Sequence, residues 1–317
     1  MDARQEMVSY DRMRHFSMQI TKIEYLIGHM HGSFELSYVL SGRGQCTVGE
    51  GTVKLEPGQL VLINPYEVHS YVAQGDEPLV LLTAQIHRLF LRRYVERIPK
   101  LRFRGGSIER LSYQQYKELV YLFAKTAAVY FTESQSQQFD ILACAILLMG
   151  KLVSDLEWQL DDTPDGAEKE LQQRRAQRLV SYIDENFRQK ITLSTLAEME
   201  DISTTHLSHF FRKAFGVTFQ SYLCNQRLEK ALVLLRDPSV PMSEIYMRCG
   251  FSDRRYLEAA CLKTFGCTVA EYREKYRQRE GQDTQQDGEQ LCSAFSWEES
   301  LAVLKEYLSP DILAELD

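Results

Sequence analysis

The sequence predicts an α+β protein: an N-terminal β-barrel with two attached helices, followed by an all-α domain. Three observations lead to this prediction. Short β-rich runs alternate with turns from Phe16 to about His87, the hydrophobic period becomes helical beyond Ser112, and residues 171–279 contain an internal repeat. The length of 317 residues is about twice that of a typical domain, and 44% hydrophobic with 26% charged residues excludes a fibrous or wholly disordered chain.

The barrel is predicted from short runs of β-branched, aromatic and aliphatic residues, such as 34–40, 45–48 and 59–63. Gly and Pro separate these runs, as in residues 41–44 and 57–58. Closely spaced strands with tight turns are typical of small barrels and jelly rolls. Beyond them, apolar residues recur at i, i+3 and i+4, which predicts two amphipathic helices at 112–131 and 138–158.

The domain boundary is placed at residues 161–166, where Pro, Gly and charged residues occur together without an apolar side chain. The expected organisation is a barrel with its helices at 1–160, a linker at 161–173, an all-α domain at 174–279 and an acidic tail at 280–317. Within the tail, Trp297 to Leu316 is expected to form an amphipathic helix.

The all-α domain repeats itself after 50 residues. The identities are Leu207/Leu257, Lys213/Lys263, Phe215/Phe265, Gly216/Gly266, Thr218/Thr268 and Tyr222/Tyr272. Each unit is predicted to be a helix, a turn and a second helix, with caps at Thr192 and Ser203 in the first unit, and a helix at 219–236 joins the units. This arrangement is typical of helix-turn-helix motifs that enter the DNA major groove; the alternative is a bundle that only packs.

The charge distribution favours the DNA-binding interpretation. The whole chain carries a net charge of −7, but residues 1–170 carry −4, residues 171–279 carry +6 and residues 280–317 carry −9. A basic segment between two acidic ones agrees with attraction to phosphate, which a packing bundle does not require.

Residues 174–277 resemble the DNA-binding domain of the AraC/XylS family of bacterial transcription regulators. The resemblance lies in ITLSTLAEMEDISTTHLSHFFRKAFGVTFQSYL (191–223) and MSEIYMRCGFSDRRYLEAACLKTFGCTVAEYR (242–273). It implies a regulator of transcription, most often an activator that contacts RNA polymerase, which binds double-stranded DNA under the control of a small-molecule effector. The effector is expected to be a sugar, and the helices after the barrel are expected to form a homodimer interface.

The resemblance also implies the DNA-contacting residues. In the first unit, base edges are expected to be contacted by Thr204, Thr205, Ser208 and His209, and phosphates by Arg212 and Lys213. In the second unit the corresponding residues are Arg254, Arg255, Tyr256, Glu258 and Ala259, with Lys263 near the backbone. The family often has Arg at the positions of His209 and Ala259 and an aromatic residue at that of Cys261. Because Ala cannot hydrogen-bond a base, we expect the second unit to read sequence less stringently.

The barrel carries His29-x-His31-x3-Glu35-x6-Gly42, then Pro57-Gly58 and Asn64-Pro65-x3-His69. This pattern resembles the cupin double motif, whose enzymes hold a divalent metal with such residues. We expect a metal-free effector pocket with His31, Glu35, Tyr38 and His69 as its polar groups, and no cofactor. The alternative is a metal site formed by His29, His31, Glu35 and His69.

Two other functions stay open: a metal-dependent cupin enzyme fused to a DNA-binding domain, and a constitutive architectural DNA-binding protein. We expect no enzyme, because the sequence has no GxSxG elbow, P-loop or GxGxxG. The N-terminus lacks an apolar export segment and the longest apolar stretch is too short to cross a bilayer, so a cytoplasmic protein without membrane contact is expected. For the acidic tail, docking on the barrel, binding a partner and competing with DNA stay open.

Overall fold

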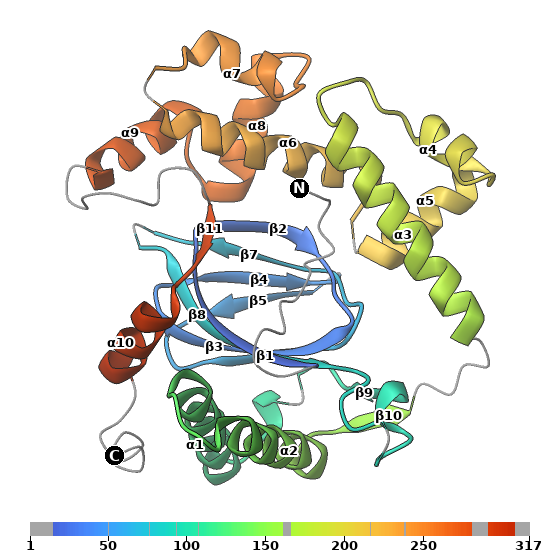
Figure 1. Cartoon of the computed structure of the whole chain (residues 1–317). Coiled ribbons are helices and arrows are strands. Elements are labelled where there is room, and N and C mark those ends of the chain that lie inside the picture. The colour runs from blue at the N-terminus through green and yellow to red at the C-terminus, as the bar shows by residue number, and fades with distance from the viewer. Residues whose placement is uncertain are drawn as a thin grey trace.

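The computed structural model describes residues 15–307 apart from 50, 76, 93, 107, 161–165, 216, 238 and 281–290. It consists of an N-terminal β-rich domain and a C-terminal helical domain that pack against each other (Figure 1). The predicted α+β class is therefore confirmed.

Two antiparallel sheets form the β-rich domain. One has the strand order β11-β1-β8-β3-β6 and the other β2-β7-β4-β5. The strands of the first are β1 (Phe16–Ile23), β8 (Leu79–His87), β3 (Ser33–Ser41), β6 (Leu60–Ile63) and β11 (Cys292–Ala294). Those of the second are β2 (Tyr25–His29), β7 (His69–Ala73), β4 (Gly44–Val48) and β5 (Gly51–Leu55). Side chains from both sheets fill the space between them, including Ile23, Val39, Cys46, Ile63, Tyr71 and Leu81.

The other face of the first sheet is covered by α1 (Tyr113–Phe131) and α2 (Gln137–Asp155), which lie side by side (Figure 1). Ser112 begins α1 with a capping box, because its Oγ accepts from Gln115 N while the Gln115 side chain accepts from Ser112 N. The two helices predicted after the barrel are confirmed, although α2 ends three residues earlier. Short elements precede and follow them: η1 (Ile98–Lys100), β9 (Leu101–Phe103), η2 (Ile108–Arg110) and β10 (Trp158–Leu160).

Among the described residues, one helix, α2, is long and apolar enough to cross a membrane by length and composition alone. Its buried side chains, Ile141, Ala145, Leu148 and Leu152 among them, belong to the core shared with α1 and the first sheet. This is also how a core helix of a globular domain packs.

The helical domain contains seven helices in its described residues. They are α3 (Gly166–Asn186), α4 (Leu193–Met199), α5 (Thr204–Phe215), α6 (Phe219–Arg236), α7 (Met242–Arg248), α8 (Arg254–Phe265) and α9 (Val269–Glu280). The helix expected at 219–236 is confirmed. Residues 166–173, which we expected to be linker, form the first turns of α3; residues 161–165 lie outside the described residues.

The sequence repeat has a structural cause. Thr218 Oγ1 accepts from Ser221 N at 3.1 Å, and Thr268 Oγ1 accepts from Glu271 N at 3.2 Å, so each repeated Thr caps the helix after its unit. One turn later the repeated tyrosines are buried. Their rings lie 5.3 Å from Phe215 and 5.1 Å from Phe265, respectively. The shared residues therefore fix how each second helix turns into the next.

The acidic tail returns to the N-terminal domain. Strand β11 pairs antiparallel with β1, with Thr21 opposite Ala294, and α10 (Trp297–Tyr307) packs on α1. The Trp297 ring lies 5.0 Å from Phe131 and 5.8 Å from Tyr130, and Leu304 is buried in the same core. Of the open roles for the tail, docking on the barrel is the one the structure contains. The rest of the helix expected to Leu316 lies outside the described residues.

Leu304 tests this docking, since its side chain is 1% exposed between α10 and α1. We expect Leu304→Ala to lower the free energy of unfolding by about 2–4 kcal/mol through lost burial and a residual cavity. Urea unfolding followed by circular dichroism measures this. The exposed neighbour Lys305 provides the control, and Lys305→Ala should change stability by less than about 0.5 kcal/mol. Equal effects of the two substitutions would contradict a docked α10.

Candidate functional site

Two helix-turn-helix units lie at the two ends of α6: α4 with α5, and α7 with α8 (Figure 1). Ser203 Oγ accepts from His206 N at 3.1 Å, and Asp253 Oδ1 accepts from Arg255 N at 2.8 Å, so the second helix of each unit begins at a capped residue. Each second helix buries one face, which includes Leu207 and Phe211 in α5 and Leu257 and Cys261 in α8. The opposite faces are open to solvent.

The first unit exposes all the side chains expected to contact DNA, which are Thr204, Thr205, Ser208, His209, Arg212 and Lys213. The four expected to contact bases lie in the first half of α5 and the two basic residues in its last turns. A major groove admits one helix, and the N-terminal part of that helix faces base edges. The first half of α5 is therefore placed to contact bases, and its last turns are placed to contact phosphates.

The second unit exposes Arg254, Arg255, Tyr256, Ala259 and Lys263. Arg255 Nη2 lies 3.0 Å from Asp253 Oδ2, and Arg254 Nη2 lies 3.2 Å from Glu258 Oε1. Both guanidinium groups stay largely exposed, and exposed ion pairs contribute little to stability. Either arginine can therefore exchange its carboxylate for a phosphate or a guanine at low cost.

Glu258 differs from the other residues expected to contact DNA. Its side chain is only partly exposed, and its Oε2 accepts a hydrogen bond from Val269 N at 3.0 Å. This amide is the first of α9, so Glu258 caps that helix, while its other oxygen pairs with Arg254. The structure thus places both carboxylate oxygens in contacts within the protein.

The second candidate site lies between the two sheets. His29, His31, Glu35 and His69 are 5%, 3%, 3% and 1% exposed, and their ligand-type atoms all lie within 4.8 Å of one another. We call these four residues the His₃Glu cluster. Glu35 Oε2 lies 2.9 Å from His31 Nε2 and 3.4 Å from His69 Nε2, and the rings of His29 and His69 are 4.0 Å apart. The residues of the alternative metal site therefore come together in space.

Tyr38 does not join this cluster, although we expected it to line the same pocket. Successive side chains of a strand point to opposite faces, so Glu35 and Tyr38, three residues apart on β3, point in opposite directions. Tyr38 packs on the helix side of the sheet, with its ring 6.5 Å from Phe123 of α1. The structure thus brings together His31, Glu35 and His69 and leaves Tyr38 apart.

Other polar residues that the sequence did not single out surround Glu35. Tyr71 Oη donates to Glu35 Oε1 at 2.7 Å, Ser37 Oγ donates to the same oxygen at 2.9 Å, and Gln85 Nε2 lies 3.4 Å from Oε2. Ser37 and Tyr71 are two residues along their strands from Glu35 and His69. Because side chains two residues apart on a strand point to the same face, alternation along the strands would have predicted Ser37 and Tyr71 beside Glu35 and His69.

The charge states in the His₃Glu cluster follow from burial and proximity. Burial, together with the neighbouring His69, holds the pKa of His29 well below its ordinary value, so this imidazole is neutral at pH 7. Burial raises the pKa of Glu35, but the adjacent His69 and His31 outweigh it and hold that pKa well below its usual range. Burial and the Glu35 charge raise the pKa of Tyr71, which remains a hydroxyl donor.

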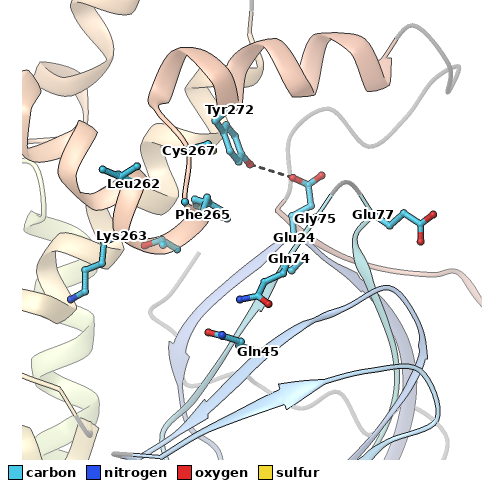
Figure 2. Close-up of a pocket in the computed structure, with 13 residues that line it drawn as sticks. Glu24, Gln45, Gln74, Gly75, Glu77, Leu262, Lys263, Phe265, Cys267 and Tyr272 are labelled. Atoms are coloured by element: carbon cyan, nitrogen blue, oxygen red, sulfur yellow. Dashed lines mark hydrogen bonds between the residues drawn. The ribbon is translucent and has the colours of Figure 1, made fainter.

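Contacts between the domains meet at Glu24, just before β2. Its Oε2 accepts from Tyr272 Oη of α9 at 3.2 Å (Figure 2). The same oxygen lies 2.9 Å from Nη2 of Arg236, which is 4% exposed at the end of α6. Beside them, a cavity of about 470 Å³ is lined by Gln45 and Gln74 of the barrel and by Lys263 and Cys267 of the second unit. The barrel thus contacts the DNA-binding domain at α6, α9 and the second unit.

Two family models match the chain. The AraC-like ligand binding domain matches residues 23–150, which contain the His₃Glu cluster, and the helix-turn-helix domain matches residues 196–275, which contain both units. The chain belongs to the AraC family of transcriptional regulators. It is a DNA-binding transcriptional activator with an N-terminal ligand-binding domain and a C-terminal helix-turn-helix domain.

Individual relatives match most of the length of this AraC-family chain. The HTH-type transcriptional activator RhaR of Salmonella dublin is 26% identical over 257 residues, which cover 77% of this chain and 86% of that protein. The RhaR of Enterobacter sp. strain 638 is 27% identical over 255 residues, covering 78% and 87%. Among solved structures, ToxT from Vibrio cholerae is 12% identical, covers 83% of this chain and 98% of its own, and has a TM-score of 0.41.

The position of Glu258 in this AraC-type domain generates a test. We expect Glu258→Gln to lower the free energy of unfolding by about 0.5–2 kcal/mol, because a helix cap is weakened. We expect the base preference of the protein to stay unchanged. Urea unfolding and selection of DNA from a randomised pool measure the two properties. A changed preference at one base pair, with unchanged stability, would instead assign Glu258 to base reading.

Proposed function

We propose that the exposed faces of α5 and α8 form the DNA interface of this regulator. The observation that carries the proposal is that both repeated units present their first turns to solvent while burying the opposite face. Thr204, Thr205, Ser208 and His209 then read bases, and Arg212, Lys213 and Lys263 contact phosphates. In the second unit, Arg254, Arg255 and Tyr256 are the candidates for base or phosphate contact, and Glu258 caps α9.

Arg212 tests the phosphate assignment. DNA fragments that bind the purified protein are first selected from a genomic library at a stated salt concentration. We expect Arg212→Ala to weaken binding to all of them to a similar degree and to reduce the slope of log K against log salt by about one, because one phosphate contact is lost. Gel-shift titration over a range of salt concentrations measures both. Lys117→Ala, on the exposed surface of α1, is the control and should leave affinity and slope unchanged.

We propose that a small-molecule effector binds at the inner face of the barrel, at His31, Glu35 and His69. These side chains, with Ser37, Tyr71 and Gln85, offer hydrogen-bond donors and acceptors that suit a hydroxyl-rich molecule such as a sugar. The cluster borders β2, whose Tyr25 and Ile27 belong to the core shared with the DNA-binding domain. An effector that binds more tightly to one position of β2 than to another shifts the equilibrium between two arrangements of the DNA-binding domain.

We propose regulation without enzymatic activity, and contact with RNA polymerase as the route to activation, in the cytoplasm and without a membrane partner. The proposal rests on the relatives, which are named as transcriptional activators. Purified protein added to in vitro transcription with RNA polymerase from a selected promoter tests it. Transcription should rise when the protein is added, and absence of a rise at saturating occupancy of the promoter would count against activation.

We propose that the protein is a homodimer and that α2 forms the interface. One stripe of α2 remains exposed and apolar: Phe139 is 78% and Leu147 is 60% exposed, with Ala143, Ile146 and Gly150 on the same face. Small residues between large ones let a second helix approach closely and bury the large side chains. The stripe faces away from α1, so a second copy of α2 can cover it without displacing the core.

Leu147→Glu tests this interface, because a buried carboxylate without a partner is costly. We expect the substitution to convert the dimer to a monomer at micromolar concentration, measured by light scattering coupled to size-exclusion chromatography. Thr52→Glu, on the exposed strand β5, introduces the same charge elsewhere and should leave the dimer intact. A dimer that survives Leu147→Glu would exclude α2 as the interface.

A further inference from the structure

The His₃Glu cluster joins residues from both sheets of the barrel. His29 ends β2 and His69 begins β7 in one sheet, Glu35 lies on β3 in the other, and His31 precedes β3. We propose that these four side chains bind one divalent transition-metal ion, so that this AraC-type regulator is a metalloprotein. The proposal concerns the residues assigned above to the effector, and its test does not depend on that assignment.

The separation of the four side chains suits a single ion. Their ligand-type atoms all lie within 4.8 Å of one another. Because imidazole and carboxylate ligands bind first-row ions at about 2.0–2.2 Å, two ligands on opposite sides of one ion lie about 4.2 Å apart. A contraction of a few tenths of an ångström, within the reach of side-chain rotation, therefore brings all four atoms to one centre.

The histidine rings are oriented as metal ligands are. His29 Nδ1 lies 3.0 Å from Ile27 O, and His69 Nδ1 lies 2.9 Å from Glu67 O. A carbonyl oxygen only accepts, so Nδ1 carries the proton in each ring and Nε2 keeps its electron pair in the neutral form. Such a hydrogen bond from the second ring nitrogen to a backbone carbonyl is typical of metal-bound histidine, because it fixes the tautomer and the ring plane.

The coordinating atoms of the cluster gather in one place. His69 Nε2 lies 3.4 Å from Glu35 Oε2, and both side chains are buried. The ring of His29 lies 4.0 Å from that of His69 and 6.1 Å from that of His31, so three imidazoles and one carboxylate oxygen are close enough to share a single ion.

The surroundings of Glu35 complete the case. Its other oxygen accepts from Tyr71 and Ser37, which holds the carboxylate in place while Oε2 faces the histidines. Three imidazoles and one carboxylate form a ligand set of borderline softness, which suits Mn²⁺, Fe²⁺, Co²⁺, Ni²⁺ or Zn²⁺ and not Ca²⁺ or Mg²⁺, which prefer oxygen ligands. No cysteine belongs to this cluster, so the described ligand set is of nitrogen and oxygen.

Cobalt binding tests the proposal directly. The full-length protein is treated with EDTA, freed of chelator and titrated with Co²⁺, whose visible absorption reports coordination by nitrogen and oxygen. We expect one equivalent of Co²⁺ per chain, displaced by Zn²⁺, without the near-ultraviolet charge-transfer band that thiolate ligands produce. Elemental analysis of the protein after Zn²⁺ loading and dialysis should give one Zn²⁺ per chain.

Variants separate the cluster from adventitious sites. His69→Gln and Glu35→Gln should weaken Co²⁺ binding by more than about 100-fold, since loss of even an outer partner of a ligand costs 10–100-fold. Tyr71→Phe, which removes one hydrogen bond to Glu35 and keeps the ring, should weaken it by about 10-fold. His206→Gln, at an exposed histidine on α5, should leave binding unchanged. Circular dichroism checks the fold of each variant.

Several results would overturn the proposal: no stoichiometric Co²⁺ or Zn²⁺ on the wild-type protein, equal binding by the folded Tyr71→Phe and His69→Gln variants, or a loss confined to His206→Gln. DNA binding is measured separately by gel shift on the metal-free protein. A protein that binds DNA but no metal would therefore refute the metal site alone. A protein that binds metal but no DNA would refute the DNA interface alone.

Discussion

Strand β2 must satisfy two cores at once, and the arrangement of both domains depends on how it does so. Tyr25 and Ile27 pack into the core of the DNA-binding domain, whereas Leu26 and His29 face the interior of the barrel. Strict alternation would not allow Leu26 and His29 on one face. A bulge between them, opposite the regular pair Tyr71 and His69, changes the register by one residue. This bulge turns His29 inward, while Tyr25 and Ile27 stay in contact with the other domain.

The DNA-binding domain shows how one local device, used twice, produces two equal recognition units. A Thr cap, a buried Tyr one turn later and a Phe that packs on this Tyr recur in both units. Between them, Gly250 is necessary in the second turn, because a side chain there would lie 2.7 Å from the backbone of Arg188 and Phe187. The repeated residues act on geometry, so the exposed residues between them are free to differ and to read different bases.

The sequence predicted the features that depend on residues close together in the chain. It did not predict the contacts between residues far apart in the chain. The bounds of α6 and the caps at Thr192 and Ser203 followed from periodicity and spacing. The grouping of three histidines with Glu35 followed from the resemblance to the cupin motif. The side of the sheet that Tyr38 occupies also lay within reach, because strand alternation alone separates it from Glu35. The Glu258 cap on α9, the Glu24 contact with Arg236 and the return of β11 to β1 join residues that no local pattern relates.

The tail limits how the ligand-binding domain controls the other one. Leu291 O accepts from the backbone N–H groups of Glu24 and Tyr25 at 2.9 and 3.3 Å, and the chain then continues through β11 on β1 to α10 on α1. Separating the domains would remove the Glu24 carboxylate from Arg236, whose side chain is buried, and an unpaired buried charge is costly. It would also expose the buried apolar side chains of Tyr25 and Ile27 to water. A small ligand supplies only its differential affinity for two states. Control by a shift of β2, which keeps these contacts, demands less free energy than domain separation, and the tail favours that route because Leu291 is hydrogen-bonded to the backbone at the start of β2.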